Sequence, residues 1–436
     1  MFAVRGGRFD DMTPEVVGNR RSVLPRGVRG AADPHFACAV RSFASMFPGR
    51  RFGGGAMAVY LDGEPVVDVW TGWSDRRGRV PWTADTATMV FSATKGMAST
   101  VIHRLADRGS IDYEAPVTEY WREFGANGKS NITVHQVMRH RAGLSALRGA
   151  SKQDLLNHEV MEQRLAAAPA GHLLGKPAYH ALTYGWLMSG LARAVTGKGM
   201  RELIRHELAE PLDTDGLHLG RPPVDAPTRP AQIIMPQTAI DNPVFNAVAP
   251  RIAALQLSGG FGAMYFPGMK AVVQGHIPFM DAEIPAANGV VTARGLARMY
   301  GAIANGGQID GTQFLSRELV ARLTGRRSLR LDRNILVPLA FHLGYHTLPF
   351  NAMPGFGHIG LGGSLGWADP ASGLAVGFVH NRLLSPFVVV DHAGFVLTSG
   401  LIRRAAAETR KHGLERVAAF GSPFPEPGAV AGSQFY

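Results

Sequence analysis

The sequence predicts an α+β fold, with an antiparallel sheet that is built from strands near both ends of the chain and flanked by helices, plus an all-helical domain. Three observations predict it. Residues 56–72 (AMAVYLDGEPVVDVWTG) are two apolar, β-rich runs around Asp62-Gly63, a pair typical of a tight hairpin. Helical patterns dominate residues 92–195. Near the C-terminus, SLGWAD and LAVGFVHN are two more strand-like runs, separated by a turn at 369–373.

The N-terminal arm and the first helix come next in the order of the chain. Residues 1–34 show no periodicity and are predicted to be irregular. The apolar side chains that follow recur at helical spacing, which indicates one amphipathic helix that stops at Pro48-Gly49. Those side chains are Phe36, Val40, Phe43 and Phe47.

The middle of the chain is predicted to hold helices and long loops. One helix covers GMASTVIHRLADRG, and a short one follows Thr133. Residues 211–285 are rich in proline, glycine and methionine and show no period, so we expect long loops with short helices. Thr292 then caps a helix over ARGLARMYGAIA, and a last helix spans roughly 395–412.

The predicted domain organisation follows from these elements. Residues 1–34 form an irregular arm, and residues 421–436, rich in proline and glycine, form a C-terminal tail. Residues 35–91 and 288–420 together form a discontinuous strand-rich domain, which the family resemblance given below implies to be an α/β sandwich, and residues 92–287 form the mostly helical domain. A chain of 436 residues is longer than one compact domain usually requires, which fits two lobes.

The net charge of +11 raises the question of a nucleic-acid partner. The basic residues are spread along the chain, and only seven of the 45 are lysines, so we attribute the charge to arginine-rich composition and predict no nucleic-acid binding. The densest basic stretch is interpreted as a solvated loop, with peripheral contact with an anionic membrane left open. It contains Arg322, Arg326, Arg327, Arg330 and Arg333.

The N-terminus and the cysteine content bear on location. The first 21 residues contain no apolar run and carry three carboxylates, so we predict no secretory signal and a cytoplasmic protein. No stretch reaches the roughly 18 consecutive apolar residues of a membrane span. The single cysteine, Cys38, cannot form an intramolecular disulfide. Oligomeric state is left open.

Ser92-Ala93-Thr94-Lys95 is the first motif that carries chemistry. The S-x-x-K spacing places both side chains on one face of a helix, one turn apart. A serine hydroxyl becomes a nucleophile when a neighbouring group takes its proton, and a buried lysine can do so once its pKa is lowered. An isolated S-x-x-K is also explained by a capping serine and a surface lysine.

Two later segments change that balance. PAGHLLGKPAYHALTYGWLMSG places Tyr179 just before a helical run, and FGHIGLGGSLGWADP places His358 in a glycine-dense strand. Together with FSATKGMAST, ITVHQVMRHRAGL and EIPAANGVVTARGLARMYGAIANGG, these segments resemble the serine β-lactamase and penicillin-binding-protein superfamily over roughly residues 54–405. The likeness is closest to the family VIII carboxylesterases and class C β-lactamase-like hydrolases. It implies the β-lactamase/transpeptidase-like fold, with the site between the sandwich and the helices.

The resemblance also implies roles for individual residues. Ser92 is expected to be the acylated nucleophile, with Lys95 and Tyr179 sharing its proton. His358 is expected to supply a hydrogen bond or a positive charge facing them. The backbone N–H groups of Ser92 and Leu361 are expected to form the oxyanion hole, with Gly360 beside them in the substrate-binding strand. The resemblance implies no cofactor.

Two positions depart from the family pattern. β-Lactamases carry a Y-x-N block whose asparagine contacts a substrate amide, whereas this chain reads Tyr179-His180-Ala181. Ile359 also replaces the hydroxylated middle residue of the third motif. Both changes favour ester cleavage over β-lactam cleavage.

Several other features have competing interpretations. Gly362-Gly363-Ser364-Leu365-Gly366 fits the G-x-S-x-G nucleophile elbow, but it lacks the required strand–turn–helix context. His140 matches a family loop position, and we expect a structural role. The histidines show no H-E-x-x-H or clustered spacing, so no metal is predicted. Two interpretations remain open for a further set of residues: they line an acyl pocket, or they fill the core. The set consists of the apolar residues Met264, Tyr265, Phe266, Phe279 and Met280.

The sequence therefore supports three functions in order. The first is a serine esterase or lipase-like hydrolase acting on a small-molecule ester or acyl substrate. The second is the same fold acting on amides, as a β-lactamase or a D-Ala-D-Ala peptidase-type enzyme. The third is a non-catalytic binding protein on this fold, and the presence of Ser92, Lys95 and Tyr179 together argues against it.

Overall fold

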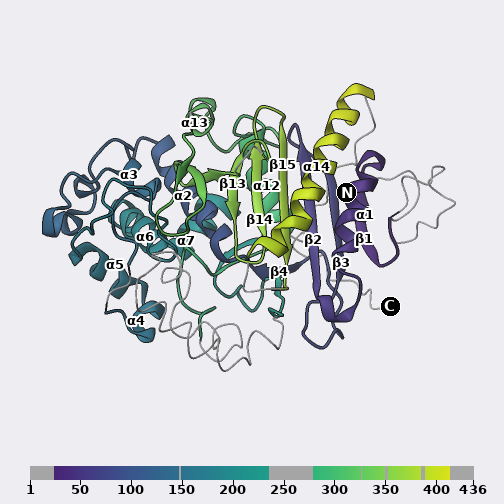
Figure 1. Cartoon of the computed structure of the whole chain (residues 1–436), viewed down its shortest axis with the longest axis horizontal. Helices are drawn as coiled ribbons and strands as arrows, with labels where there is room; N and C mark the ends of the chain where they lie inside the picture. The colour runs from purple at the N-terminus through teal and green to yellow at the C-terminus, as the bar shows by residue number, and fades with distance from the viewer. Residues whose placement is uncertain are drawn as a thin grey trace.

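The structure is a computed structural model that describes residues 24–146, 149–234, 278–325, 327–348, 352–383 and 388–412. The described part consists of a large antiparallel sheet with helices on both faces, a small sheet beside it, and a group of helices from the middle of the chain (Figure 1). This arrangement confirms the predicted α+β fold.

The large sheet has nine strands in the order β1-β3-β2-β15-β14-β13-β12-β11-β10, all antiparallel. The two ends of the chain meet at its centre, where β2 pairs with β15 and Ala58 lies opposite Gly377. The strands are β1 Val28–Ala32, β2 Gly54–Leu61, β3 Glu64–Gly72, β10 Arg330–Leu331, β11 Pro338–His342, β12 Tyr345–Thr347, β13 Phe356–Ile359, β14 Leu365–Asp369 and β15 Leu374–His380.

The predicted hairpin is present, and the predicted irregular arm needs a correction. Asp62 (φ 52°) and Gly63 (φ 81°) both have positive φ, as the tight turn between β2 and β3 requires. Strand β1 lies within residues 1–34 and pairs with β3. Gly30 hid this strand because glycine ordinarily interrupts one. Here it has φ 105° and packs so closely on β3 that a Cβ would overlap the Asp68 carbonyl.

Helices cover both faces of the large sheet (Figure 1). On one face, α1 (Ala37–Ser45) and α14 (Val388–His412) bury an apolar cluster with β2, β3 and β14. On the other, α12 (Ala293–Ala304) lies across β2, β14 and β15, and α2 (Thr94–Asp107) packs against β13. Thr292 caps α12 as predicted. Helix α14 begins seven residues earlier than expected. The sequence did not indicate this start, because the first turn is a Val388-Val389-Val390 run of low helix propensity.

A small four-stranded sheet lies next to the start of α2. Its order is β5-β7-β4-β6, with β4 and β6 parallel and the other pairs antiparallel. The strands are β4 Thr86–Met89, β5 Leu217–Leu219, β6 Arg229–Pro230 and β7 Gly289–Val291. A separate two-stranded hairpin pairs β8 Gln308–Ile309 with β9 Thr312–Gln313. Much of the predicted loop segment 211–285 lies outside the described residues.

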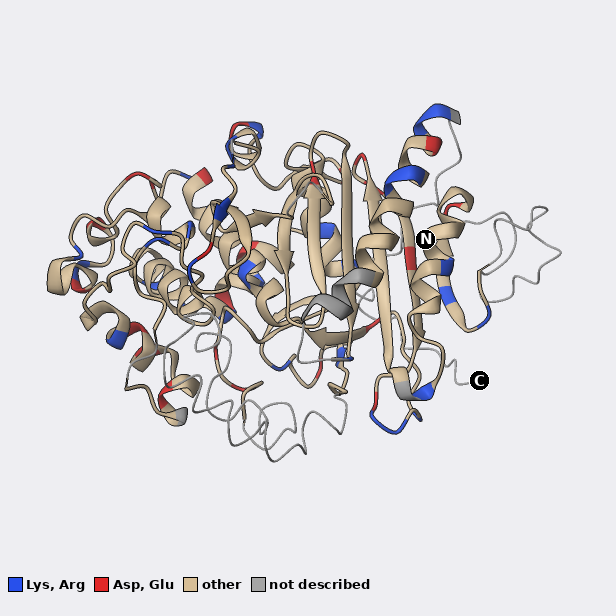
Figure 2. Ribbon diagram, in the orientation of Figure 1, with Lys and Arg blue, Asp and Glu red and all other residues tan. Residues whose placement is uncertain are grey.

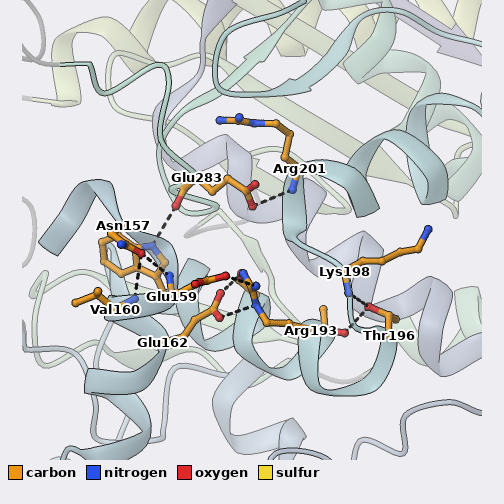
Figure 3. Close-up of polar contacts among 12 residues, drawn as sticks. Asn157, Glu159, Val160, Glu162, Arg193, Thr196, Lys198, Arg201 and Glu283 are labelled. Atoms are coloured by element: carbon orange, nitrogen blue, oxygen red, sulfur yellow. Dashed lines mark hydrogen bonds and ion pairs between the residues drawn. The ribbon is translucent and has the colours of Figure 1, made fainter. Parts of the chain in front are cut away.

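The middle of the chain contributes α3 Val134–Met138, α4 Lys152–Leu156, α5 His158–Ala167, α6 Thr183–Thr196 and α7 Met200–Leu203, and α13 Arg317–Leu323 follows later. An ion pair between the buried Glu162 and the partly exposed Arg193 joins α5 to α6 (Figure 3). Arg193 Nε lies 2.9 Å from Glu162, which also accepts from Ser189, and Arg193 contacts Glu159 as well. Burial raises the pKa of Glu162, and the contacts with Ser189 and Arg193 oppose that rise because they stabilise the charged form.

Charged side chains are distributed over most described elements. In Figure 2 the basic residues are interleaved with acidic ones along the helices and loops.

Among the described residues, no helix combines the length and the apolar character that crossing a membrane requires.

Candidate active site

Ser92 lies in a tight connection between β4 and α2. The preceding residue, Phe91, has φ 48°, a left-handed conformation that is strained for a bulky side chain and must be held by its surroundings. Thr94 holds it, because its hydroxyl donates to the Phe91 carbonyl at 2.6 Å and accepts from the Gly289 N–H of β7 at 2.8 Å. The small sheet therefore fixes the turn that carries Ser92 at the start of α2.

Lys95 is fully buried one turn further along this helix, and its amine has three partners. Nζ lies 3.2 Å from Ser92 Oγ, 2.7 Å from the Ala181 carbonyl oxygen and 3.0 Å from the Ala286 carbonyl oxygen. Burial holds the pKa of Lys95 well below its usual value. A neutral amine has two N–H donors and one lone pair. The two carbonyls accept both donors, which leaves the lone pair for the Ser92 hydroxyl.

The Ala286 carbonyl is positioned by the loop between Glu283 and Gly289. Trp186 of α6 donates its ring N–H to the Glu283 carbonyl at 3.1 Å, and the Arg201 N–H donates to the Glu283 carboxylate at 3.2 Å (Figure 3). Gly185 lets α6 approach closely, since a Cβ there would overlap Ala286 N. Any residue type supplies a backbone carbonyl, so the sequence contained no signal for the contact between Lys95 and the Ala286 carbonyl.

Tyr179 is the third member of the cluster. Its hydroxyl interacts with the Ser92 side chain, and its ring centroid lies 4.9 Å from Lys95 Nζ. Burial raises the pKa of Tyr179, and the interaction with Ser92 opposes that rise. The ring stacks on Phe341 of β11 at 5.7 Å, and Asn334 donates to the Tyr179 carbonyl at 2.9 Å. The structure thus brings together Ser92, Lys95 and Tyr179.

Tyr184 occupies a different place. It is fully buried in α6, and its hydroxyl is 2.7 Å from Ser99 Oγ on α2. This tyrosine joins two helices.

His358 on β13 is buried beside the cluster, with its ring centroid 6.4 Å from that of Tyr179. Its Nδ1 donates to the Ile359 carbonyl at 3.0 Å. Burial lowers the pKa of His358 well below its usual value, so the ring is neutral and its Nε2 is an acceptor. Of the two contributions expected of His358, this environment favours the hydrogen bond over the positive charge. Nε2 is buried and has no hydrogen-bond partner within the described part of the chain.

His140 and His180 lie next to Tyr179. The His180 N–H donates to His140 Nδ1 at 3.1 Å, while the His180 ring accepts from the Leu144 N–H at 3.1 Å and donates to the Ala178 carbonyl at 2.6 Å. Burial lowers the pKa of His180 to about 4. These contacts fix the backbone on both sides of Tyr179 and agree with the structural role predicted for His140.

The predicted oxyanion donors lie where β13 meets the start of α2. A Cβ at Gly360 would overlap the Val90 carbonyl, so only glycine allows this approach. The Gly360 N–H donates to the Ser364 carbonyl at 2.7 Å. Neither the Ser92 nor the Leu361 N–H has an acceptor among the described residues, and both residues are partly exposed. Two donors thus remain for a substrate oxygen.

Ser364 does not form a nucleophile elbow. It lies between the antiparallel strands β13 and β14, so no helix follows it. Its side chain is buried and accepts from the His380 N–H at 3.2 Å. The elbow interpretation is therefore wrong.

The apolar candidates and metal ligands can be placed only in part. Met264, Tyr265 and Phe266 lie outside the described residues, whereas Phe279 is buried in the core and Met280 packs against it. Across the described ranges, no group of three or more His, Cys, Asp and Glu side chains is arranged to hold a metal ion.

The comparisons with known proteins agree with this geometry. A family model described as Beta-lactamase matches residues 39–398, most of the chain. The chain belongs to the beta-lactamase family. This beta-lactamase family protein is 71% identical over 409 residues to "Esterase/beta-lactamase LipL" of Mycobacterium tuberculosis, a match covering 93% of this chain and 95% of that protein.

Solved structures of the family resemble it as well. A family VIII carboxylesterase superposes with a TM-score of 0.72 at 29% identity and covers 87% of this chain and 99% of its own. A penicillin-binding protein homolog from Caulobacter crescentus gives the same TM-score, identity and coverage. The predicted membership of the serine β-lactamase and penicillin-binding-protein superfamily is confirmed.

Proposed function

We propose that this family member is a serine carboxylesterase that cleaves small-molecule esters through an acyl-enzyme on Ser92. The observation that carries the proposal is the environment of Lys95, whose amine has two carbonyl acceptors and Ser92 Oγ as its partners. A surface lysine needs no such arrangement, and neither does a protein that only binds ligands. The names of the 71% identical relative and of the carboxylesterase structure support ester cleavage.

Acylation uses groups that are already in contact. Ser92 Oγ attacks the ester carbonyl carbon while its proton passes to the lone pair of Lys95, either directly or relayed through the Tyr179 hydroxyl, which gives up its own proton as it takes the one from Ser92. The N–H groups of Ser92 and Leu361 stabilise the oxyanion. The bond to the alcohol oxygen then breaks, this oxygen takes the proton from Lys95 directly or through the Tyr179 hydroxyl, the alcohol leaves, and the acyl group remains on Ser92.

Deacylation reverses these transfers with water in place of the alcohol. Lys95 takes a proton from the attacking water, directly or through the Tyr179 hydroxyl, then that proton returns to Ser92 Oγ as the acyl bond to Ser92 breaks and the carboxylic acid is released. His358 offers Nε2 as a neutral acceptor beside them, suited to a hydroxyl of substrate or water.

The preference for esters over β-lactams rests on two side chains. The Ala181 methyl group packs with Tyr179 and Phe341, where the family's asparagine would meet a substrate amide. Ile359 packs into the core on the sheet face opposite His358 and offers no hydroxyl. A buried polar group without a partner costs about 1–3 kcal/mol, so the combined penalty for a β-lactam exceeds about 2 kcal/mol.

β-Lactam hydrolysis is the second candidate, because the name of the 71% identical relative includes that activity. The deciding experiment measures kcat/KM for p-nitrophenyl butyrate and nitrocefin on one preparation. The proposal predicts that the ester is favoured by more than roughly 30-fold. Nitrocefin turnover equal to or above that of the ester would replace it with the β-lactamase function.

A further inference from the structure

The hairpin of β10 and β11, residues 329–339, exposes an unusual concentration of apolar side chains. Four of the ten large apolar side chains that are exposed in the described part of the chain lie within nine residues of this hairpin. They are Leu329 (49% exposed), Leu331 (52%), Leu336 (62%) and Val337 (40%). Single exposed apolar residues are ordinary on a protein surface, but a group of them marks an interaction site.

Four hydrogen bonds to Asp332 or from it hold the loop that carries Leu336 and Val337. The Asp332 N–H donates to the Val337 carbonyl at 3.1 Å, and the Leu336 N–H donates to the Asp332 carbonyl at 3.0 Å. The Asp332 carboxylate accepts the N–H groups of Asn334 and Ile335. Leu336 has φ 55°, a strained conformation for leucine. The fold therefore holds this leucine in water, where it gains no packing.

The charge of the hairpin favours an anionic partner. Arg330 and Arg333 are exposed, and neither pairs with a carboxylate among the described residues. Arg322 and Arg327 of the same basic stretch are engaged, because their guanidinium groups lie over the rings of Tyr113 and Phe356. Arg326 lies outside the described residues.

Exposed leucines together with unpaired arginines match the chemistry of an anionic lipid surface. Acyl chains accept the apolar side chains, and phosphate groups at the headgroup level accept the guanidinium groups. We propose that the β10–β11 hairpin docks the protein on anionic phospholipid bilayers.

The hairpin also adjoins the active site. Asn334 is hydrogen-bonded to the Tyr179 carbonyl, and the Arg333 N–H donates to the Pro177 carbonyl at 2.9 Å. On its inner side, Ile335 and Leu339 pack against the cluster of Tyr179, Ala181 and Phe341. Docking through this hairpin therefore holds the Tyr179 side of the site next to the bilayer, where esters with long acyl chains reside.

The test is co-sedimentation of the full chain with vesicles of phosphatidylcholine, with and without about one-third phosphatidylglycerol. We expect binding to the anionic vesicles that weakens as salt is raised. Leu331→Asp combined with Leu336→Asp should weaken partitioning more than about tenfold. Arg330→Gln combined with Arg333→Gln should weaken it on the order of fivefold per arginine.

Three controls separate docking at the hairpin from the effect of a new surface charge, from catalysis and from folding. Val224→Asp alters a side chain that is 95% exposed elsewhere and should bind like the native protein. Ser92→Ala should also bind, so the docking proposal can be tested even if the esterase proposal fails. Equal unfolding midpoints establish that the hairpin variants are folded.

Four results would overturn the docking proposal. One is native protein that stays in the supernatant with anionic vesicles at low salt. The second is equal binding to neutral and anionic vesicles, and the third is binding that the folded hairpin variants retain. The fourth is a dimer that Leu331→Asp dissociates, because the leucines would then serve self-association.

Discussion

The amine of Lys95 lies 3.2 Å from the hydroxyl oxygen of Ser92, and the Ala181 and Ala286 carbonyls are its other two partners. Lys95→Arg should therefore reduce kcat/KM for p-nitrophenyl butyrate by at least about 10³-fold, because a guanidinium cannot give up its proton at working pH. Lys129→Arg is the matched control. Lys129 is likewise a buried lysine with three partners, but all three are carbonyls, those of Ala126, Ala166 and Ala168, and none is Ser92. An active Lys95→Arg variant would exclude Lys95 as the base.

The rate should depend on pH through Lys95. Burial lowers the pKa of this amine, and only its neutral form can take the Ser92 proton. kcat/KM should therefore fall as the solution is acidified below that lowered pKa and reach its plateau above it. A pH–rate profile on a soluble ester measures this. An activity that begins to rise only near the ordinary lysine pKa would contradict the environment described here.

The two tyrosines should respond differently to loss of the hydroxyl. Tyr179→Phe removes the hydroxyl that interacts with Ser92 and should lower kcat/KM by roughly 10²–10⁴-fold. Tyr184→Phe removes only the bond to Ser99, so it should lower the free energy of unfolding by about 1 kcal/mol and keep most activity. Steady-state kinetics and urea unfolding of both variants provide the measurements. A larger kinetic loss in Tyr184→Phe would reverse the assignment.

Stability should fall on mild acidification because histidines are buried in neutral form. Burial lowers the pKa of His103 to about 3 and that of His180 to about 4, whereas both titrate near 6.5 when unfolded. Below pH 6.5 the unfolded state binds protons that the native state excludes. The free energy of unfolding should therefore fall by about 2 kcal/mol per histidine between pH 7 and pH 5.

Urea unfolding at several pH values measures that slope. His103→Gln should lessen the fall, while His172→Gln, at an exposed position, should leave it unchanged. A slope that is the same in all three proteins would show that burial of His103 does not couple to protonation.

The sequence predicted the fold and the site residues where side-chain patterns carry the information. The Asp62-Gly63 turn, the Thr292 cap and the S-x-x-K spacing are local signals, and the structure places them as expected. Strand β1 was missed because Gly30 reads as a breaker until its contact with β3 is known.

Other parts of the site depend on contacts between distant segments. The Ala181 and Ala286 carbonyls reach Lys95 across 86 and 191 residues of sequence, and any residue type supplies a carbonyl. The neutral state of His358 follows from its burial, which composition does not reveal. The stacking of Phe341 on Tyr179 likewise depends on the pairing of the sheet's last strands.

The most direct test of the central claim is covalent labelling of the nucleophile. A fluorophosphonate should react with the native protein, and peptide mass mapping should place a single phosphonyl adduct on Ser92. Ser92→Ala should take no label and show no ester turnover, while Ser364→Ala should be labelled and active, because Ser364 is buried between two strands. An adduct on Ser364 or another residue, or an active Ser92→Ala variant, would contradict the account.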